Sequence, residues 1–508
     1  MTVRRLDPGP NRALQGKHRS PLPVILVIAI AALWPSLLNG GPFYHPDTPT
    51  YLRAAAAGSY KTVGLRTAWT DKFLHVYVRQ KPGIAGPSDV SMAETQGPVT
   101  LKGRSIYYGI FLYLSYLLGS LWIVVAVQSL LAATSVYLTV RTIGRAQGMP
   151  VPRTWILVIG LIATLGTSYG FFAAYLMPDI FTGLGALAVA NLLFLWNCQS
   201  RSEKVFWIAL LAYAMLVHST ILMLGAGLLL VSVAFALWQR IPITFAQLAS
   251  VGGCIAGALL GQAAYSMAVT AGTGEPPVRV PFVAMRLIAD GPGYDYLQEH
   301  CPTERYVYCR VLGQEHPYSD VLLWSTDPNI SLFRGLDADD QRASAEQQTR
   351  FVFAVLKEHP LAVMSTAARN SMAQLLGMDL SNFNYSAVNR QRFDSAVPSA
   401  SYASMKLTRA YDGRMPTRFV ETSMAVLCAL SLLFLVAFLA GSKLNAGPQV
   451  RAYCLCILAA IAINAAVCGA LSGPKGRYES RLIWVLPIIA AAVAATSGAV
   501  MMAANRDV

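Results

Sequence analysis

The sequence predicts an all-α polytopic membrane protein with about ten transmembrane helices. Of its 508 residues, 55% are hydrophobic and only 13% are charged, and the mean hydropathy is +0.46. Soluble proteins carry about 25% charged residues, so an ordinary soluble domain is excluded. Several apolar runs approach or exceed the ~20 residues that a helix needs to cross a bilayer.

Apolar runs place the crossings in order along the chain. The first, 22–38, follows a basic segment without a small-x-small cleavage site, which indicates an uncleaved anchor rather than a removed signal. The ten expected spans are about 22–39, 121–140, 154–170, 180–197, 205–218, 220–238, 246–269, 418–440, 452–471 and 482–503. An even number of crossings puts both termini on the same side, expected to be the cytoplasm.

The net charge of +14 follows this topology. The predicted inner segments hold 14 of the 40 Lys and Arg residues but only three of the 26 Asp and Glu residues. Short cytoplasmic loops are enriched in Lys and Arg, so the bilayer explains the basic excess, and no nucleic-acid partner is expected. The sequence thus predicts four parts of the chain: a cytoplasmic tail 1–21, a membrane module 22–270, an outer loop domain 271–417 and a membrane module 418–508.

Two long segments face outward, 41–103 within the first module and 271–417. Loops of this length usually carry function. Segment 104–119 begins with Arg104 and paired tyrosines, which favours an interfacial helix over a crossing. The segment 350–376 has helical periodicity broken at His359-Pro360, and predicts two short amphipathic helices on the membrane surface. A smaller packed domain of mixed structure is expected at 271–345.

Two of the eight cysteines lie in the long outer loop. Cys301 and Cys309 are eight residues apart, and an oxidising compartment favours a disulfide between them. A metal pair is the weaker alternative, because no partner cluster gives a zinc spacing. The other six cysteines fall in or beside the spans and are interpreted as small core residues.

Ionisable residues at membrane depth are functional candidates, and here they gather on the outer side. His45, Asp47 and Tyr51 follow the first span, and Asp179 begins the fourth. His218 lies in the turn between the fifth and sixth. The last outer turn adds four more residues, Lys475, Arg477, Tyr478 and Arg481.

Each of these residues also has a purely structural interpretation. Asp47, before Thr48-Pro49, and Asp179, before an apolar helix, both fit helix N-caps. His218 fits a buried, hydrogen-bonded histidine. The cations of the last outer turn could extend to anionic headgroups. Their gathering on one side favours a common site.

The chemistry that suits this set is transfer from a phosphate-activated donor. Arg477 and Arg481, with Lys475 secondary, would stabilise the charge on a leaving phosphate. Asp47, Asp179 and His218 are the candidate catalytic residues, with Asp47 as the base. Partial burial is expected to raise the pKa of Asp47 toward neutrality so that it can take the proton of the acceptor hydroxyl. His45, Tyr51 and Tyr478 complete the predicted binding residues.

The order of these motifs resembles the GT-C superfamily of membrane glycosyltransferases, which take sugars from polyprenyl-phosphate carriers. The resemblance covers most of 22–270 and 418–500 as an order of elements. It consists of "HPDTPTYLRAA" after the first span, "MPDIFTG" at the fourth, "VHST" between later spans and "GRYESRLIWVLP" before the last. It implies a bacterial inner-membrane enzyme with a periplasmic active site, a polyprenyl-phosphate sugar as donor and a glycolipid or polysaccharide as acceptor.

In that family the acid of the first loop acts as base or substrate anchor, which corresponds to Asp47, and the last-loop Arg lies near the donor phosphate, which corresponds to Arg477. Many members carry an acidic pair in the first loop, whereas Asp47 is flanked by Pro46 and Thr48. No metal site is therefore assigned, and a divalent cation, which some relatives use, would have only His45, Asp47 and Asp179 as ligands.

Two other functions stay open. An O-antigen polymerase or ligase would depend on the large late loop, including His300, His316 and His359. A flippase or transporter of lipid-linked sugars predicts charges midway through spans and broken helices in related halves. A soluble-type hydrolase or nucleotide enzyme is not indicated, because the chain has no G-x-S-x-G, H-E-x-x-H or P-loop motif.

Overall fold

The computed structural model describes residues 20–79, 100–101, 104–301, 303–314, 318–441 and 447–504. Most of the tail 1–21 lies outside these residues, as does His316 of the long outer loop. The described chain is almost entirely helical. Its strands are two residues each, β1 (Thr100–Leu101) and β2 (Val278–Arg279), which pair in parallel.

Seven segments of the described residues are long and apolar enough to cross a membrane, so the chain is a multi-pass helical membrane protein. They are Leu22–Asn39 (α1 Leu22–Ala31 and α2 Trp34–Asn39), α6 (Trp122–Ala146), α11 (Ser219–Gln239), α12 (Phe245–Thr273), α20 (Thr417–Ala440), α21 (Pro448–Leu471) and Gly476–Ser497 (α22 Gly476–Ile483 and the first part of α23 Val485–Ala504). Each corresponds to one of the ten expected spans.

The other three expected spans are shorter helices. These are α7 (Arg153–Gly166), α9 (Ile180–Phe194) and α10 (Arg201–Val217), of 14, 15 and 17 residues. At 1.5 Å per residue the longest is about 25 Å, less than the ~30 Å hydrocarbon core. Helix α5 (Ile106–Leu117) has 12 residues, too few to cross, in keeping with the interfacial helix expected at 104–119.

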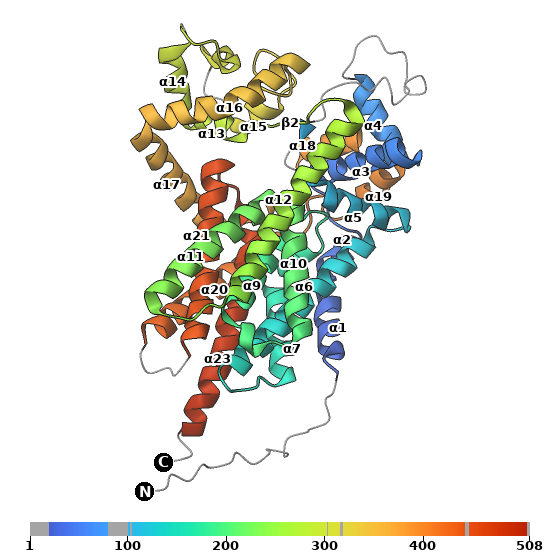
Figure 1. The fold of residues 1–508 in the computed structure, drawn as a ribbon. Coiled ribbons are helices and arrows are strands. Elements are labelled where there is room, and N and C mark those ends of the chain that lie inside the picture. The colour runs from blue at the N-terminus through green and yellow to red at the C-terminus, as the bar shows by residue number, and fades with distance from the viewer. Residues whose placement is uncertain are drawn as a thin grey trace.

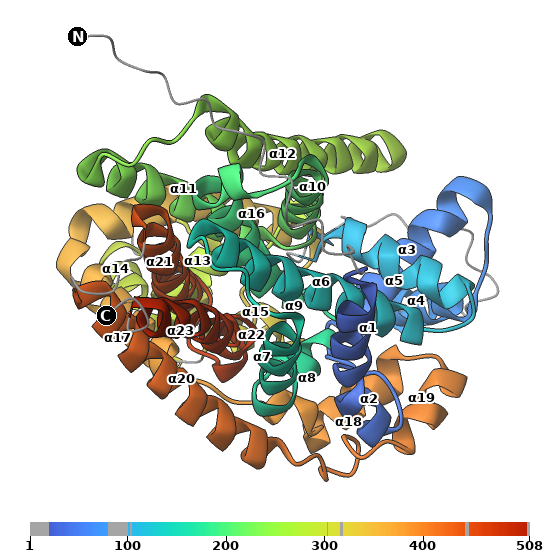
Figure 2. The ribbon, with the colours of Figure 1, turned by 90° about the horizontal axis from the view of Figure 1, so that it is seen from below.

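Helix α9 is the centre of the bundle. All of its residues are buried, and it packs against α6, α10, α11, α21 and α22. Figure 2 shows it enclosed by these helices. A helix that is hydrophobic on every side is a core helix, so α9 fixes the place of whatever lies at its ends. Asp179 lies immediately before it.

A second hydrophobic core belongs to the outer loop domain, at the end of the molecule opposite the first residues of α1 and the last of α23 (Figure 1). Its elements are α13 (Phe282–Asp290), α14 (Pro292–His300), the 3₁₀ turn Val307–Val311, α15 (Ser319–Trp324) and α16 (Ala338–Glu358). The expectation of mixed structure is not met, because β2 is the one strand among its described residues. Cys301 and Cys309 form a disulfide beside α14.

The helix break predicted at His359-Pro360 is present, but its two helices do not lie on a surface by themselves. Helix α16 contributes Phe351 and Val355 to the outer-domain core. Helix α17 (Pro360–Leu376) packs along α21. Each helix thus packs one part of its apolar face against protein, while Phe353, Leu361 and Met364 stay exposed.

The first outer loop also folds into helices. Its described part forms α3 (Thr48–Val63) and α4 (Ala68–Arg79), which lie beside α5, α18 (Ala387–Ala396) and α19 (Ser399–Lys406) in Figure 1. The remaining short elements are α8 (Tyr169–Ala173), the 3₁₀ turn Trp196–Cys198 and the 3₁₀ turn Ser381–Phe383. The packing of α3 on α5 brings the start of α3 over the bundle.

Candidate functional site

The His45-Pro46-Asp47-Thr48 turn is built by local hydrogen bonds. The backbone N–H of His45 donates to Thr48 Oγ1 at 2.9 Å, and that hydroxyl donates to the carbonyl of Leu176 at 3.0 Å. The turn is therefore tied to the segment before Asp179. Asp47 occupies the N-cap position of α3, as the structural interpretation foresaw, yet its side chain makes no capping hydrogen bond.

The Asp47 carboxylate faces other side chains instead. It forms an ion pair with Arg104, and its Oδ2 lies 3.4 Å from Nδ1 of His45. Arg104 precedes α5 and also lies over the ring of Trp324, 5.4 Å from its centroid, in the outer domain. The sequence predicts an interfacial position for Arg104. Because Arg104 directly precedes an apolar helix, the sequence also allowed it to pair with an acidic residue at the site.

The expected rise of the Asp47 pKa is wrong in direction. Burial acts to raise the pKa of this carboxyl, but the charges of Arg104 and Arg477 and the neighbouring His45 outweigh it and hold the pKa well below 3.8. Asp47 is thus an ionised, paired carboxylate. The influence of Arg477 also shows that the first and last outer turns share one electrostatic environment.

Asp179 is the second carboxylate of the site. It stands at the N-cap position of α9, and again the side chain makes no capping hydrogen bond. Its side chain is fully buried. Oδ1 lies 3.6 Å from Nε of Arg477 and 3.5 Å from Nη1 of Arg481, so both guanidinium groups of α22 converge on it.

Helix α22 presents its charged residues inward. The guanidinium groups of Arg477 and Arg481 lie over the ring of Tyr478, 5.2 and 5.0 Å from its centroid. Asn464 of α21 accepts from Nη2 of Arg481 at 3.4 Å and donates to Glu479 at 3.0 Å. Asn464 and Glu479 were not singled out from the sequence, because an Asn inside an apolar run and a Glu beside two arginines have no distinguishing pattern.

Both imidazoles at the site are neutral at pH 7. Burial and then the charge of Arg477 lower the pKa of His45 from 6.5 to about 4. Its Nδ1 accepts the backbone N–H of Asp47 at 3.2 Å, so its approach to the carboxylate is a contact and not an ion pair. Burial and the charge of Arg481 lower the pKa of His218 from 6.5 to about 3, although Asp179 acts in the opposite direction.

His218 combines the two roles considered for it. Its Nδ1 accepts from the backbone N–H of Thr220 at 3.2 Å and caps α11. The charges of Arg104, Asp179, Arg477 and Arg481 all act on its ring. We define the polar cluster as His45, Asp47, Arg104, Asp179, His218, Arg477 and Arg481.

Several buried polar atoms in and beside the polar cluster have no hydrogen-bond partner among the described residues. They include both carboxylate oxygens of Asp179, Nη1 of Arg477, Nε and Nη1 of Arg481 and the hydroxyl of Tyr175. Buried polar atoms are rarely left unpaired. Donors and acceptors are thus both available at one place.

Two of the predicted binding residues end in different surroundings. Tyr51 is buried on α3, and the charges of Arg104 and Asp47 act on its phenol, so it belongs beside the polar cluster. Lys475 does not join the cluster, because its Nζ pairs with Asp320 of α15 at 2.7 Å in a half-exposed contact. His45, Asp47 and Asp179 do not form a common set of ligand atoms in the described structure.

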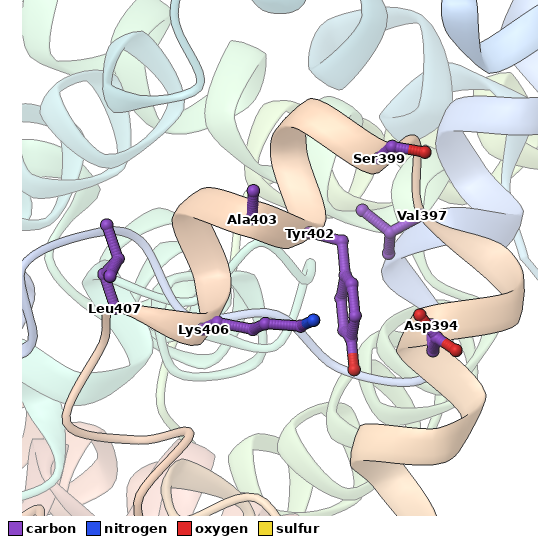
Figure 3. Close-up of a pocket in the computed structure, with 7 residues that line it drawn as sticks. All are labelled: Asp394, Val397, Ser399, Tyr402, Ala403, Lys406 and Leu407. Atoms are coloured by element: carbon purple, nitrogen blue, oxygen red, sulfur yellow. The ribbon is translucent and has the colours of Figure 1, made fainter.

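Two pockets lie outside the polar cluster. One is lined by Asp394, Val397, Ser399, Tyr402, Ala403, Lys406 and Leu407 of α18, α19 and their connections (Figure 3). The other is an apolar groove between α10 and α12, lined by Ile208, Ala212, Leu216, Ala249, Ser250, Gly253, Cys254, Gly257 and Ala258.

The apolar groove reaches the start of α5. Ser105 Oγ donates to the carbonyl of Leu216 on α10 at 2.7 Å, and the Tyr107 hydroxyl donates to the carbonyl of Gly261 on α12 at 2.7 Å. Since Arg104 directly precedes Ser105, one end of the groove lies beside the polar cluster.

No family model, curated protein or solved structure matches this chain. The functional conclusion therefore depends on the geometry of the site.

Proposed function

We propose that this protein is a membrane glycosyltransferase that moves a sugar from a polyprenyl-phosphate carrier to an envelope glycolipid or polysaccharide. The observation that carries the proposal is the set of buried atoms without a hydrogen bond at the polar cluster, with guanidinium and phenol donors beside the Asp179 carboxylate. A sugar phosphate could form hydrogen bonds with both kinds of group. Its phosphate oxygens would accept from the donors, and its hydroxyl groups would donate to the acceptors.

Arg477 and Arg481 would hold the donor phosphate. Hydrogen bonds between a guanidinium and a phosphate are charge-assisted and about twice as strong as neutral ones. Burial strengthens them further, because water does not compete. The Tyr478 ring beneath both groups and Asn464 beside Arg481 orient them before the ligand arrives. This arrangement suits the stabilisation of charge on a leaving phosphate.

Asp179 would accept hydrogen bonds from hydroxyl groups of the transferred sugar. Its two oxygens are buried, carry no hydrogen bond and lie 3.5 to 3.6 Å from the arginines. The charge of both arginines keeps a carboxylate at this position compatible with burial. Sugar and phosphate would then be held by adjacent groups of opposite sign.

Asp47 would act as the base after a change of partners. In the free protein Arg104 holds it as an ion pair, which makes it a weak base. The incoming phosphate competes for Arg104, and the freed carboxylate then takes the proton. The acceptor hydroxyl oxygen forms a bond to the anomeric carbon while the bond from that carbon to phosphate oxygen breaks, and the phosphate leaves with the electron pair.

The apolar groove between α10 and α12 would hold the polyprenyl chain. It is lined mainly by aliphatic residues and glycines of α10 and α12, and its end adjoins Arg104 through Ser105 and Tyr107. The expected topology of ten crossings in a bacterial inner membrane would then put the phosphate at the periplasmic face, below the outer domain.

The test is transfer by purified protein in lipid nanodiscs. Radiolabelled polyprenyl-phosphate sugars are incubated with an envelope lipid extract, and transferred label is counted. Removing a general base typically costs 10²- to 10⁴-fold, so we expect Asp47→Asn to lose about that factor in rate.

Asp71→Asn is the matched control, because Asp71 pairs with Arg66 in an exposed contact on α4. Its rate should equal that of the wild type. Equal rates for the wild type and Asp47→Asn would contradict the assignment of the base, and no transfer from any polyprenyl-phosphate sugar by the wild type would contradict the proposed function.

A further inference from the structure

Two Glu-His pairs, far apart in the sequence, meet in the outer domain. Glu299 and His300 end α14, and Glu358 and His359 end α16. One ligand atom each of Glu299, Glu358 and His359 lies within 4.8 Å of the others. Nε2 of His300 lies 3.4 Å from Oε1 of Glu358. None of these residues belongs to the polar cluster.

His300 has one ring nitrogen held by the backbone and the other beside Glu358. Its Nδ1 lies 3.1 Å from the carbonyl oxygen of Tyr296, which can only accept, so Nδ1 carries the proton. Its other ring nitrogen, Nε2, faces the carboxylate of Glu358. Its ring stacks on Tyr296, with centroids 4.2 Å apart and planes 8° from parallel. A backbone carbonyl on one nitrogen is the usual support of a metal-binding histidine.

His359 supplies a second available nitrogen. It lies at the junction of α16 and α17. Its Nε2 is buried and has no hydrogen-bond partner among the described residues. An unpaired buried polar group is destabilising, and a ligand at this nitrogen would remove that cost. Two carboxylates and the His359 imidazole therefore lie close together. The His300 imidazole adjoins them through its contact with Glu358.

We propose that Glu299, His300, Glu358 and His359 bind a divalent transition-metal cation of the Zn²⁺ class. Two nitrogen and two carboxylate ligands suit Zn²⁺ in a tetrahedral site. Ligand atoms about 2.0 Å from such an ion lie roughly 3.3 Å from one another. The glutamate side chains are exposed at this surface and can move the short remaining distance. The adjacent Cys301 is bound in the disulfide with Cys309 and offers no thiolate.

Such a site would fix the outer domain against the membrane bundle. The cation would join the end of α14 to the junction of α16 and α17. Helix α17 packs along α21, and Gln374 near its end exchanges two hydrogen bonds with the backbone of Lys475, just before α22. The site is thus coupled to the helix that carries Arg477. The proposal does not depend on the identity of the reaction.

The test uses untagged, full-length protein that has been treated with a chelator and then titrated with Zn²⁺. Calorimetry and elemental analysis measure affinity and stoichiometry. We expect one Zn²⁺ per chain, with at least a 10-fold loss of affinity in Glu358→Gln and in His359→Gln. Glu346→Gln, an exposed glutamate on the same helix, should bind like the wild type. Co²⁺ bound at the site should give the visible absorption of tetrahedral coordination.

Glu299→Gln tests the site without disturbing the fold, because Glu299 is exposed on the surface. This variant should keep the wild-type circular dichroism and elution volume but lose affinity for Zn²⁺. Stoichiometric Zn²⁺ that all three site variants retain with wild-type affinity would overturn the proposal. Absence of stoichiometric Zn²⁺ in the folded wild type would do the same.

Discussion

At the scale of single residues, the position of a carboxylate on its helix does not reveal its role. Asp47 and Asp179 both stand at N-caps, where Asp normally accepts from the first turn of its own helix. Neither does so. Each is turned toward guanidinium groups from distant segments, Asp47 toward Arg104 and Asp179 toward Arg477 and Arg481. Their electrostatic partners, and not the caps, explain why they are charged at this depth.

The pair formed by Asp179 and Arg477 should show strong energetic coupling. Removing one partner of a buried ion pair leaves an uncompensated charge and costs about 3 to 5 kcal/mol. We expect Asp179→Ala and Arg477→Gln each to lower the thermal stability of the detergent-solubilised protein. The double variant should lose less than the sum of the single losses. Strict additivity in this cycle would show that the two residues do not interact.

The two imidazoles should make the protein sensitive to acid. His45 and His218 have folded-state pKa values of about 4 and about 3, below the ordinary 6.5. Between pH 6.5 and about 4 the unfolded chain therefore binds protons that the folded chain does not, and stability falls as the pH is lowered. Asp47 acts in the same direction only near the acid end of this range, because its pKa is 3.8 in the unfolded chain and well below that in the folded one.

We expect the wild-type Tm to fall more steeply from pH 7.5 to pH 5 than the Tm of a His45→Gln/His218→Asn variant. Asn at position 218 keeps an acceptor for the cap of α11. Parallel slopes for the two proteins would assign the acid sensitivity to other groups.

Much of the site could be foreseen from residue type and location. Ionisable groups at the ends of apolar runs are rare unless they have a function. Four residues of the site are of this kind: Asp179, His218, Arg477 and Arg481. Arg104 could not be assigned this way, because its pairing with Asp47 arises only when α3 packs on α5. The error in the Asp47 pKa has the same origin: burial was visible in the sequence, but the compensating charge was not.

At the scale of elements, apolar run length predicted the seven long apolar segments well and the three shorter helices less well. The run 180–197 ends as a helix at Phe194, followed by the 3₁₀ turn Trp196–Cys198. Because α9 is enclosed by other helices, its length is set by its neighbours and not by the bilayer. For α16 and α17 the difficulty is different, because their amphipathic pattern matches both a membrane surface and a protein surface.

The contact between α17 and α21 offers a test at this scale. A Cβ atom at Gly469 would lie 2.6 Å from the carbonyl oxygen of Asn370 and 2.8 Å from the Cα of Ser371. These are backbone atoms of α17, so the two helices would have to separate. We expect Gly469→Ala to cost about 1 to 3 kcal/mol of stability, measured as a lowered Tm.

Gly252→Ala on α12 is the control, because a Cβ there meets no atom within 4 Å. Its effect should be neutral or slightly stabilising, since Ala is the better helix former. Similar losses for both variants would mean that close approach of α17 and α21 is not what Gly469 provides.

At the scale of the whole molecule, the chain forms a membrane bundle and an outer domain with separate hydrophobic cores. Contacts between the two surround the polar cluster, since Arg104 lies over Trp324 and Lys475 pairs with Asp320. The cluster itself takes residues from positions 45 to 481. Helical class and multi-pass character followed from composition and run length. Which turns converge required the packing of α9 and α22.

The most direct test of the central claim, that this cluster binds the phosphate of a lipid carrier, is native mass spectrometry of the protein with equimolar polyprenyl phosphate and polyprenol. We predict at least a 10-fold preference for the phosphate in the wild type and its loss in an Arg477→Gln/Arg481→Gln variant. Lys475→Gln, a neighbouring cation outside the polar cluster, should keep the wild-type preference. Equal binding of the two lipids by the wild type, or loss of the preference in Lys475→Gln alone, would contradict the claim.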